Sequence, residues 1–330
     1  MRVGRSLLAV AVGASTGCAS NAPADPTRPE VGQPIPPRAD LDEWLRVRES
    51  RFDDIVPGAE KRILWAGAPG ERTSLSVVYL PGFFATRQET APVAELVAAR
   101  LSANLFETRL TGHGRGTGAT GDVSLQAWLA DTWEAWEVGT RIGDRVVLVG
   151  MSTGAPLAAW VTHRVRAAGA DRDRVAATVL LSPNFAPADE RANLILRPFG
   201  RLILWIVEGR YREWEPENEM QRRYWTTRQR SNALVPMMET VRLGNQTPVE
   251  EVSTPMLMVY TKNDTVISIP AALALYERWG GSPKRLVDLP DAPGHALAGY
   301  ILSPHTTEPL AREIVDFAAR LDPADTGADG

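Results

Sequence analysis

The sequence predicts an α/β fold, in which a mostly parallel β-sheet is flanked by helices and carries an inserted helical cap. Short, continuously apolar runs such as 145–149 and 175–181 alternate with longer amphipathic segments along the chain. This alternation is typical of parallel strands that are buried on both faces and joined by helices. It stops between residues 184 and 250, a block with apolar runs and a stretch rich in charged and aromatic residues. We therefore predict that this block is an insertion over the carboxyl edge of the sheet.

The predicted elements follow one another regularly on both sides of the insertion. Strands are predicted at residues 63–66, 74–80, 105–110, 145–149, 175–181, 255–260 and 285–289. Helices are predicted at residues 88–101, 124–140 and 153–168, and near 270–279 and 307–321. The turn sequence at 67–70, which contains two glycines and a proline, predicts a hairpin between the first two strands.

The composition of the 330-residue chain is that of a folded protein, with 44% hydrophobic and 23% charged residues. A net charge of −4 provides no broad basic surface, so nucleic acid is not expected as a partner. The only cysteine, Cys18, leaves no internal disulfide and no cysteine cluster for a metal. Since the sequence also has no phosphate-binding loop, dinucleotide fingerprint or metal-ligand spacing, no cofactor is expected.

Residues 1–18 are expected to be an export signal. Arg2 and Arg5 precede an apolar stretch that is too short to span a membrane, which is the plan of a secretory signal. The segment that ends at Cys18 also resembles a bacterial lipobox, although Ser15 stands where leucine is usual. We therefore expect a lipidated Cys18 and an exported, membrane-anchored lipoprotein of the cell envelope. Plain secretion, with Cys18 discarded or idle, is the alternative.

The rest of the chain is expected to divide into four parts. Residues 19–40 contain six prolines and little apolar mass, which predicts an extended linker. Residues 41–183 and 251–321 are expected to form the α/β core, with the cap between them at 184–250. Residues 322–330 are expected to be a disordered tail.

The pattern G-x-S-x-G, from Gly150 to Gly154, identifies a candidate nucleophile. It follows the apolar strand at 145–149 and opens a helix, which is the strand–turn–helix setting of a nucleophile elbow. The glycines leave room for a tight turn, and the N-terminus of the helix favours developing negative charge. Ser152 is therefore the predicted nucleophile. The alternative is an ordinary serine in a glycine turn.

A serine hydroxyl needs a histidine to accept its proton and a carboxylate to orient that histidine. In this kind of fold both follow the serine in the chain. His295, in a glycine-containing loop after the last strand, is the predicted base, and Asp264, just past the strand at 255–260, is the predicted acid. Asp288 and Asp291 suit the role less well, since the first falls within a strand and the second is four residues from His295.

The other three histidines are predicted to have other roles. His305 begins the last helix and is expected at the surface or at a helix cap. His163 lies inside the helix that follows the nucleophile, where it is expected to pack or face solvent. His113 precedes the nucleophile in the chain and is expected to be structural or to line the substrate site.

Two backbone N–H groups are predicted to bind the oxyanion of the tetrahedral intermediate. One belongs to Thr153, directly after the nucleophile. The other belongs to Phe83, in the loop after the strand at 74–80, where Gly82 lets the backbone turn close to the site.

Together these segments resemble the α/β-hydrolase superfamily, especially its monoacylglycerol lipase and small bacterial carboxylesterase branch. The resemblance covers roughly residues 60 to 321 and is carried, in the family's order, by the segments 80–83, 111–114, 150–154, 263–266 and 294–295. It implies Ser152 as nucleophile, Asp264 as acid and His295 as base, with Phe83 and Thr153 as oxyanion donors. Two departures are Pro81, where the family often has histidine, and Thr153, where leucine, methionine or glutamine is commoner; the second puts the shape of the pocket wall in question.

The predicted function is a serine hydrolase that cleaves carboxylic esters through an acyl-enzyme on Ser152. The apolar residues within 194–206 would form an acyl-chain pocket or a lipid-facing lid, or would simply pack on the sheet domain. The first of these favours a small ester or monoacyl lipid as substrate. An acyltransferase, thioesterase or peptidase could use the same triad, and a non-catalytic surface lipoprotein is a further alternative, although no member of the triad is missing.

Overall fold

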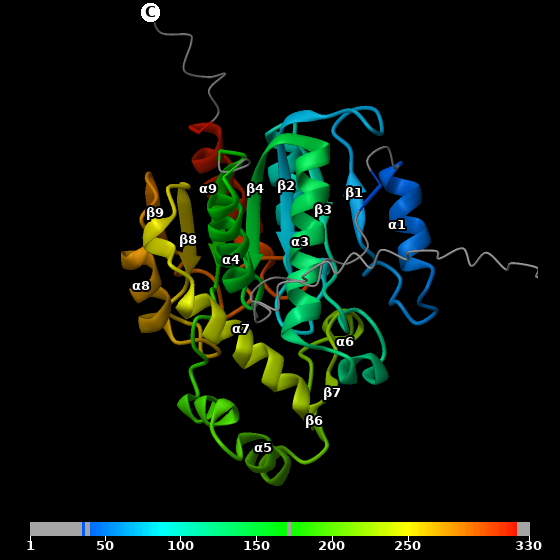
Figure 1. Ribbon diagram of the computed structural model, residues 1–330, viewed down its shortest axis with the longest axis vertical. Coiled ribbons are helices and arrows are strands. Elements are labelled where there is room, and N and C mark those ends of the chain that lie inside the picture. The colour runs from blue at the N-terminus through cyan, green and yellow to red at the C-terminus, as the bar shows by residue number, and fades with distance from the viewer. Residues whose placement is uncertain (1–34, 37–39, 170–172, 322–330) are drawn as a thin grey trace, which may run out of the picture.

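A seven-stranded sheet in the order β1-β3-β2-β4-β5-β8-β9 lies at the centre of the protein (Figure 1). The computed structural model describes residues 35–36, 40–169 and 173–321. Strand β1 pairs antiparallel with β3, and the other neighbouring strands pair in parallel. The strands are β1 (Arg62–Leu64), β2 (Thr73–Leu80), β3 (Asn104–Glu107), β4 (Gly143–Met151), β5 (Val175–Leu181), β8 (Met256–Tyr260) and β9 (Lys284–Asp288). The predicted α/β class is confirmed.

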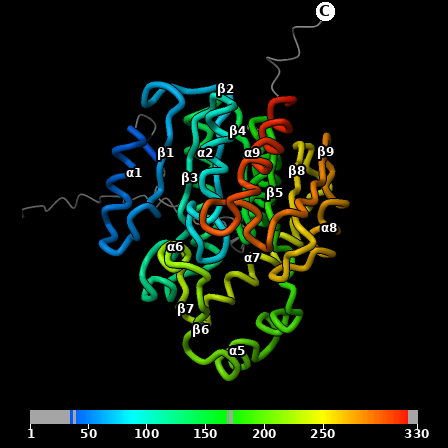
Figure 2. Tube along the Cα trace, turned by 180° about the vertical axis from the view of Figure 1, so that it is seen from behind, coloured from blue at the N-terminus to red at the C-terminus, as the bar shows by residue number. Residues whose placement is uncertain are grey.

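Helices cover both faces of the sheet (Figures 1 and 2). One face is covered by α3 (Leu125–Ile142), α4 (Gly154–Ala168) and α8 (Ile269–Arg278), and the other by α2 (Val93–Arg100) and α9 (Pro304–Ala319). The first core contains Trp128 and Leu148, and the second contains Val149 and Leu310, all at most 2% exposed. Because successive residues of β4 face opposite sides, the strand contributes to both cores, which explains its continuous apolar run.

The predicted hairpin between the first two strands is wrong. Strand β3 lies between β1 and β2, so β1 pairs with β3 and not with β2. The predicted turn does form, with the Glu71 N–H donating to the carbonyl of Ala68. Strand β3 takes this central position because every one of its residues is buried. Its backbone N–H and carbonyl groups therefore need hydrogen-bond partners on both sides, which β2 provides in parallel and β1 antiparallel.

The described part of the N-terminal region packs against the core. Helix α1 (Leu41–Glu49) is capped by Asp40, whose side chain accepts hydrogen bonds from the N–H groups of residues 42 and 43. Ile35, within the segment predicted as a linker, is 3% exposed, and the Arg141 guanidinium donates to its carbonyl and to that of Pro36. The predicted signal with Cys18, most of the predicted linker and the predicted tail lie outside the described residues.

The chain between β5 and β8 stands at the carboxyl edge of the sheet, where it forms the lower part of the molecule in Figure 1. It comprises a 3-10 helix (Glu190–Leu196), α5 (Gly200–Glu208), β6 (Tyr211–Glu213), α6 (Glu219–Tyr224), β7 (Arg228–Arg230) and α7 (Leu234–Gln246). Strands β6 and β7 form a small antiparallel ribbon in addition to the expected helices. Leu204 of α5 is buried, whereas Leu202, Trp205, Ile206 and Val207 of the same helix, and Phe199 directly before it, are exposed.

The turn from β4 into α4 leaves no room for side chains at its two glycines. A Cβ atom at Gly150 would lie 2.4 Å from the carbonyl oxygen of Gly154, and one at Gly154 would lie 2.2 Å from the carbonyl oxygen of Leu80. Both neighbours are backbone atoms, which cannot move aside as a flexible side chain can.

We expect Gly154→Ala to lower the free energy of unfolding by about 1–3 kcal/mol, the usual cost of inserting an extra methyl group into a packed site. Gly118→Ala is the matched control, since a Cβ there would meet nothing within 4 Å. Urea unfolding of both variants measures the difference. Equal stability of the two variants would show that the turn can relax and that the contact with Leu80 is not limiting.

Candidate active site

The backbone of Ser152 has the strained conformation that points its side chain out of the turn. Its φ angle is +51°, in the left-handed region that residues other than glycine seldom adopt. Two backbone hydrogen bonds hold it there: the Ser152 N–H donates to the carbonyl of Leu181 at 2.9 Å, and the Asn184 N–H donates to the Ser152 carbonyl at 3.1 Å. Neighbouring strand ends therefore fix this turn.

The structure brings Ser152, His295 and Asp264 together in one hydrogen-bonded series. The Ser152 Oγ atom lies 2.9 Å from Nε2 of His295, and Nδ1 of the same ring lies 2.7 Å from Oδ2 of Asp264. The serine follows β4, the aspartate follows β8 and the histidine follows β9. Since these strands run parallel, their carboxyl ends meet at one edge of the sheet and deliver all three side chains to the same place.

The surroundings of Asp264 keep its carboxyl ionised. Burial raises the pKa of this carboxyl, but the hydrogen bond and charge of His295 and the N–H groups of Val266 and Ile267 together lower it below its ordinary value. Those N–H groups donate to Oδ1 at 2.8 and 3.2 Å, which leaves Oδ2 for the histidine. An acceptor-only carboxylate requires the proton on Nδ1 of His295, so Nε2 is free to accept the serine proton.

The loop that carries His295 is tied to the acid loop and to β5. The Ser182 hydroxyl donates to the His295 carbonyl at 2.9 Å. The Asn263 side chain, next to Asp264, donates to the carbonyls of Pro290 and Ala292 at 3.0 and 2.9 Å. These bonds fix the distance between the aspartate and the histidine without involving either side chain.

The N–H groups of Phe83 and Thr153 are available for an oxyanion. On either side of Phe83, the Gly82 N–H donates to Glu89 and the Phe84 N–H donates to Nε2 of His113, at 2.7 and 2.8 Å. Neither the Phe83 nor the Thr153 N–H has an acceptor among the described residues. The loop is therefore anchored through the amides that flank the predicted donor.

His113 has a structural role, one of the two predicted for it. Burial lowers the pKa of His113 to about 3, so the ring is neutral. Because Nε2 accepts from Phe84, the ring proton is on Nδ1, which faces the Thr111 carbonyl at 3.2 Å. His113 lines neither cavity at Ser152 and instead supports the loop that carries Phe83.

The remaining candidates lie away from the triad. His163 is 3.6 Å from Glu251, and His305 is exposed in the first turn of α9. Asp288 ends β9 and pairs with Lys262 at 3.0 Å, and Asp291 is exposed. Within residues 40–169 and 173–321, no group of three or more histidine, aspartate or glutamate side chains is arranged to hold a metal ion.

Two cavities open at the triad, and both are lined by Phe83, Glu89 and His295. The first, of about 620 Å³, also contains Ser152 and has an apolar wall from the cap: Leu194, Ile195, Ile203, Leu204, Val207, Leu234 and Met237. The second, of about 590 Å³, has a more polar wall that includes Arg212, Trp214, Glu217, Gln221, Trp225, Gln229 and Asn263. The site can therefore take an apolar group on one side of the triad and a polar group on the other.

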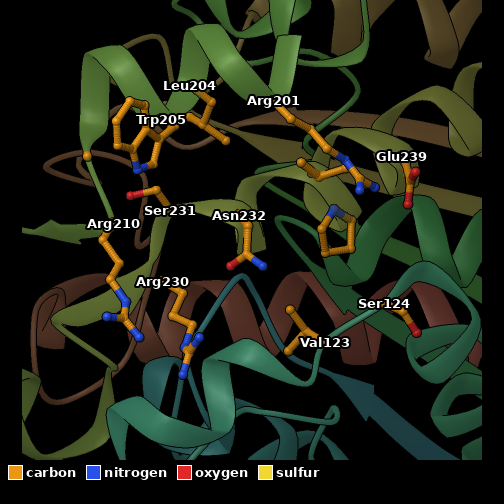
Figure 3. A pocket seen from close by; sticks show the side chains of 13 residues that line it. Val123, Ser124, Arg201, Leu204, Trp205, Arg210, Arg230, Ser231, Asn232 and Glu239 are labelled. Carbon is orange, nitrogen blue, oxygen red and sulfur yellow. The ribbon is translucent and has the colours of Figure 1, made fainter. Parts of the chain in front are cut away.

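A third cavity, of about 500 Å³, lies near α5, β7 and α7 and contains no predicted site residue (Figure 3). Arg201, Arg210 and Arg230 line it together with Glu239. Leu204 of α5 lines both this cavity and the apolar one, so α5 stands between them.

Residues 77–311 match the sequence model of the alpha/beta hydrolase family. The chain belongs to this family. The predicted hydrolase fold and the predicted membership of this family, though not of a particular branch of it, are thereby confirmed. No curated protein matches this hydrolase significantly in sequence.

Solved structures of similar fold include several lipolytic enzymes. A metagenome-derived lipolytic enzyme from a study of LipS and LipT superposes with a TM-score of 0.65 at 19% identity, covering 81% of this hydrolase and 99% of that chain. A soluble variant of monoglyceride lipase from Saccharomyces cerevisiae gives 0.60 at 11% identity, covering 79% and 91%. The monoacylglycerol lipase of Paleococcus ferrophilus gives 0.57 at 14% identity, covering 79% and 98%. At these identities the similarity concerns the fold.

Glu89, which was not among the predicted site residues, lines both cavities beside the triad. In the sequence it is one acidic residue at the start of a predicted helix, where acidic residues are common for reasons of helix dipole alone. Its contact with Gly82 arises only when the chain after β2 folds back, and no local pattern signals that.

Proposed function

We propose that this hydrolase is a serine esterase that cleaves carboxylic esters through an acyl-enzyme on Ser152. The observation that carries the proposal is the series Ser152 Oγ–His295 Nε2–Asp264, with distances of 2.9 and 2.7 Å. The free N–H groups of Phe83 and Thr153 support it, because an acyl transfer needs donors for its oxyanion.

In the first half of the reaction, Ser152 Oγ attacks the ester carbonyl carbon while His295 Nε2 accepts the hydroxyl proton. The carbonyl oxygen becomes an oxyanion that the N–H groups of Phe83 and Thr153 stabilise. The C–O bond to the alcohol then breaks as His295 returns the proton to the alcohol oxygen, which leaves the acyl group on Ser152. Asp264 stays ionised and stabilises the cationic imidazole between these steps.

In the second half, a water molecule attacks the acyl carbon and gives a proton to His295 Nε2. The ester bond to Ser152 Oγ breaks, the proton returns to Oγ, and the carboxylic acid leaves. The enzyme regains its initial state, and the whole cycle uses no cofactor.

The proposed substrate class is a monoacyl lipid or a similar ester. The apolar cavity under the cap suits an acyl chain, and the more polar cavity on the other side of His295 suits the alcohol. The exposed apolar surface of α5 agrees with a substrate drawn from lipid. Two of the structural neighbours are described as lipases of this class of ester, which is consistent with the proposal.

Export and lipidation at Cys18 are also proposed, on the lipobox-like sequence alone. Within the described ranges, no helix is long and apolar enough to cross a membrane. We expect the mature protein from a bacterial host to begin with Cys18 carrying a diacylglyceryl thioether, which mass spectrometry of the N-terminal peptide would detect. Cleavage at another residue, or an unmodified Cys18, would contradict this.

A fluorophosphonate probe tests the nucleophile directly. We expect the wild type to be labelled and Ser152→Ala to lose both labelling and ester hydrolysis, because the probe reacts only with an activated serine. Ser231→Ala is the control: this serine is also buried, but it lines only the third cavity. Equal labelling of wild type and Ser152→Ala would refute the assigned nucleophile.

Narrowing the apolar cavity tests the acyl pocket. We expect Ile203→Trp, which fills part of this cavity, to lower kcat/KM for dodecanoyl relative to butyryl p-nitrophenyl esters by about tenfold, the effect of about two methylene groups at about 0.8 kcal/mol each. Leu202→Trp is the matched control, because the neighbouring Leu202 does not line the cavity. A similar change in both variants would place the acyl chain elsewhere.

A further inference from the structure

Glu89 is an ionisable group beside the triad that takes no part in the mechanism above. It ends the short 3-10 helix Arg87–Glu89, is 4% exposed, and lines both cavities. Its Oε1 atom accepts hydrogen bonds from the Gly82 N–H at 2.7 Å and from the Tyr79 hydroxyl at 2.8 Å. The Oε2 atom has no hydrogen-bond partner among the described residues.

The free oxygen of Glu89 and the side chain of Ser152 pack against the same side of Gly82. A Cβ atom built on Gly82 would be 2.8 Å from Glu89 Oε2 and 3.2 Å from Cβ of Ser152, so the carboxyl oxygen and the nucleophile approach the same point. Gly82 directly precedes Phe83, whose N–H is the proposed oxyanion donor. Glu89 therefore holds the loop that carries the proposed oxyanion donor, and its free oxygen lies against the same side of Gly82 as Ser152 does.

Burial favours the neutral form of this carboxyl. Desolvation raises the pKa of Glu89 to about 8, although the hydrogen bonds from Gly82 and Tyr79 act in the opposite direction. Among the described residues, no cation forms an ion pair with Glu89. Since Oε1 accepts two hydrogen bonds, the proton of the neutral acid belongs on Oε2.

Other charged or titratable groups share these surroundings. Those that line a cavity with Glu89 or bond to it are Tyr79, Asp189, Arg191, Glu208, Arg212, Glu217 and His295. Of these groups, Tyr79 alone acts on the pKa of Glu89, through its hydrogen bond. Burial raises the pKa of Tyr79 well above 10, so this phenol remains a neutral donor.

We propose that Glu89 is a positioning residue whose neutral carboxyl anchors the oxyanion loop through Gly82 and keeps negative charge away from the forming oxyanion. This inference rests on the proposed function, because it requires an oxyanion at Phe83 and Thr153. A carboxylate at the same place would repel the oxyanion through a poorly screened, buried environment. The rate of acylation is therefore expected to fall reversibly as pH rises through about 8.

The pH dependence of acylation tests this role. kcat/KM for p-nitrophenyl butyrate and the second-order rate of fluorophosphonate labelling are measured from pH 6 to 10. We expect both to fall about tenfold or more between pH 8 and 10 in the wild type, the range over which a group with this pKa ionises. Glu89→Gln retains an acceptor for Gly82 and Tyr79 but cannot ionise, so it should remain within a few-fold of wild type at pH 7 and lose the alkaline fall.

Two further variants separate this role from a merely structural one. Tyr79→Phe removes a hydrogen bond that lowers the pKa of Glu89, so the midpoint of the fall should move to higher pH. Glu107→Gln is the matched control. Glu107, at the end of β3, is another buried carboxyl, and burial raises its pKa to about 7. It pairs with Arg62 and Arg87 and lines neither cavity, so its loss should leave the alkaline fall unchanged.

An alkaline fall that persists in Glu89→Gln, or a midpoint that Tyr79→Phe leaves in place, would overturn the proposal. Thermal unfolding of each variant checks that it is folded. If Glu89→Gln does not fold, the shift of the midpoint in Tyr79→Phe still decides the test. Failure of the proposed function has a different signature: the wild type would then show neither ester hydrolysis nor labelling that depends on Ser152.

Discussion

The contact between the β4–α4 turn and the end of β2 is the constraint on which the candidate site depends. Gly154 lies so close to the Leu80 carbonyl that only a hydrogen atom fits between its Cα and that backbone. The loops that follow β2 and β4 therefore start side by side, and each carries one of the two proposed oxyanion donors, the N–H groups of Phe83 and Thr153. A side chain at position 154 would push apart the two strand ends and with them these proposed donors. The absence of a side chain at position 154 is thus needed both for the packing of this turn and for the proposed chemistry.

The surroundings of the buried ionisable groups near the site determine whether each group is charged or neutral. Asp264 is held as a carboxylate by two backbone N–H groups and His295, whereas His113 is held neutral by burial. Glu89 receives hydrogen bonds as well, but burial outweighs them and favours the acid. Burial and hydrogen bonding thus leave Asp264 ionised, and they leave the two groups that bond to the loop around Phe83, His113 and Glu89, neutral. This distribution suits a reaction that develops negative charge near Phe83 and positive charge on His295.

Most of the fold and the triad could be predicted because their signals are local or follow from chain order. Apolar runs marked the central strands, and the glycines around Ser152 marked the turn. The order of serine, acid and histidine selected Asp264 and His295, since parallel strands present their carboxyl ends at one edge. The first strand pair was wrong because a turn sequence reports a change of direction and not the partner of the strands that flank it. Strand β3, the next strand after β2 in the chain, lies between β1 and β2.

The sequence by itself determined the α/β class, the nucleophile turn and the candidates for acid and base, because each depends on residue type, periodicity or chain order. Only the tertiary structure decided which amides around Phe83 are occupied, that His113 supports this loop, and that Glu89 stands beside Ser152. It also decided that α5 buries Leu204 while exposing most of its other apolar side chains. The physical reason is that burial, and the proton states that follow from it, depend on segments far apart in the chain. A local sequence pattern does not indicate which of these segments come into contact.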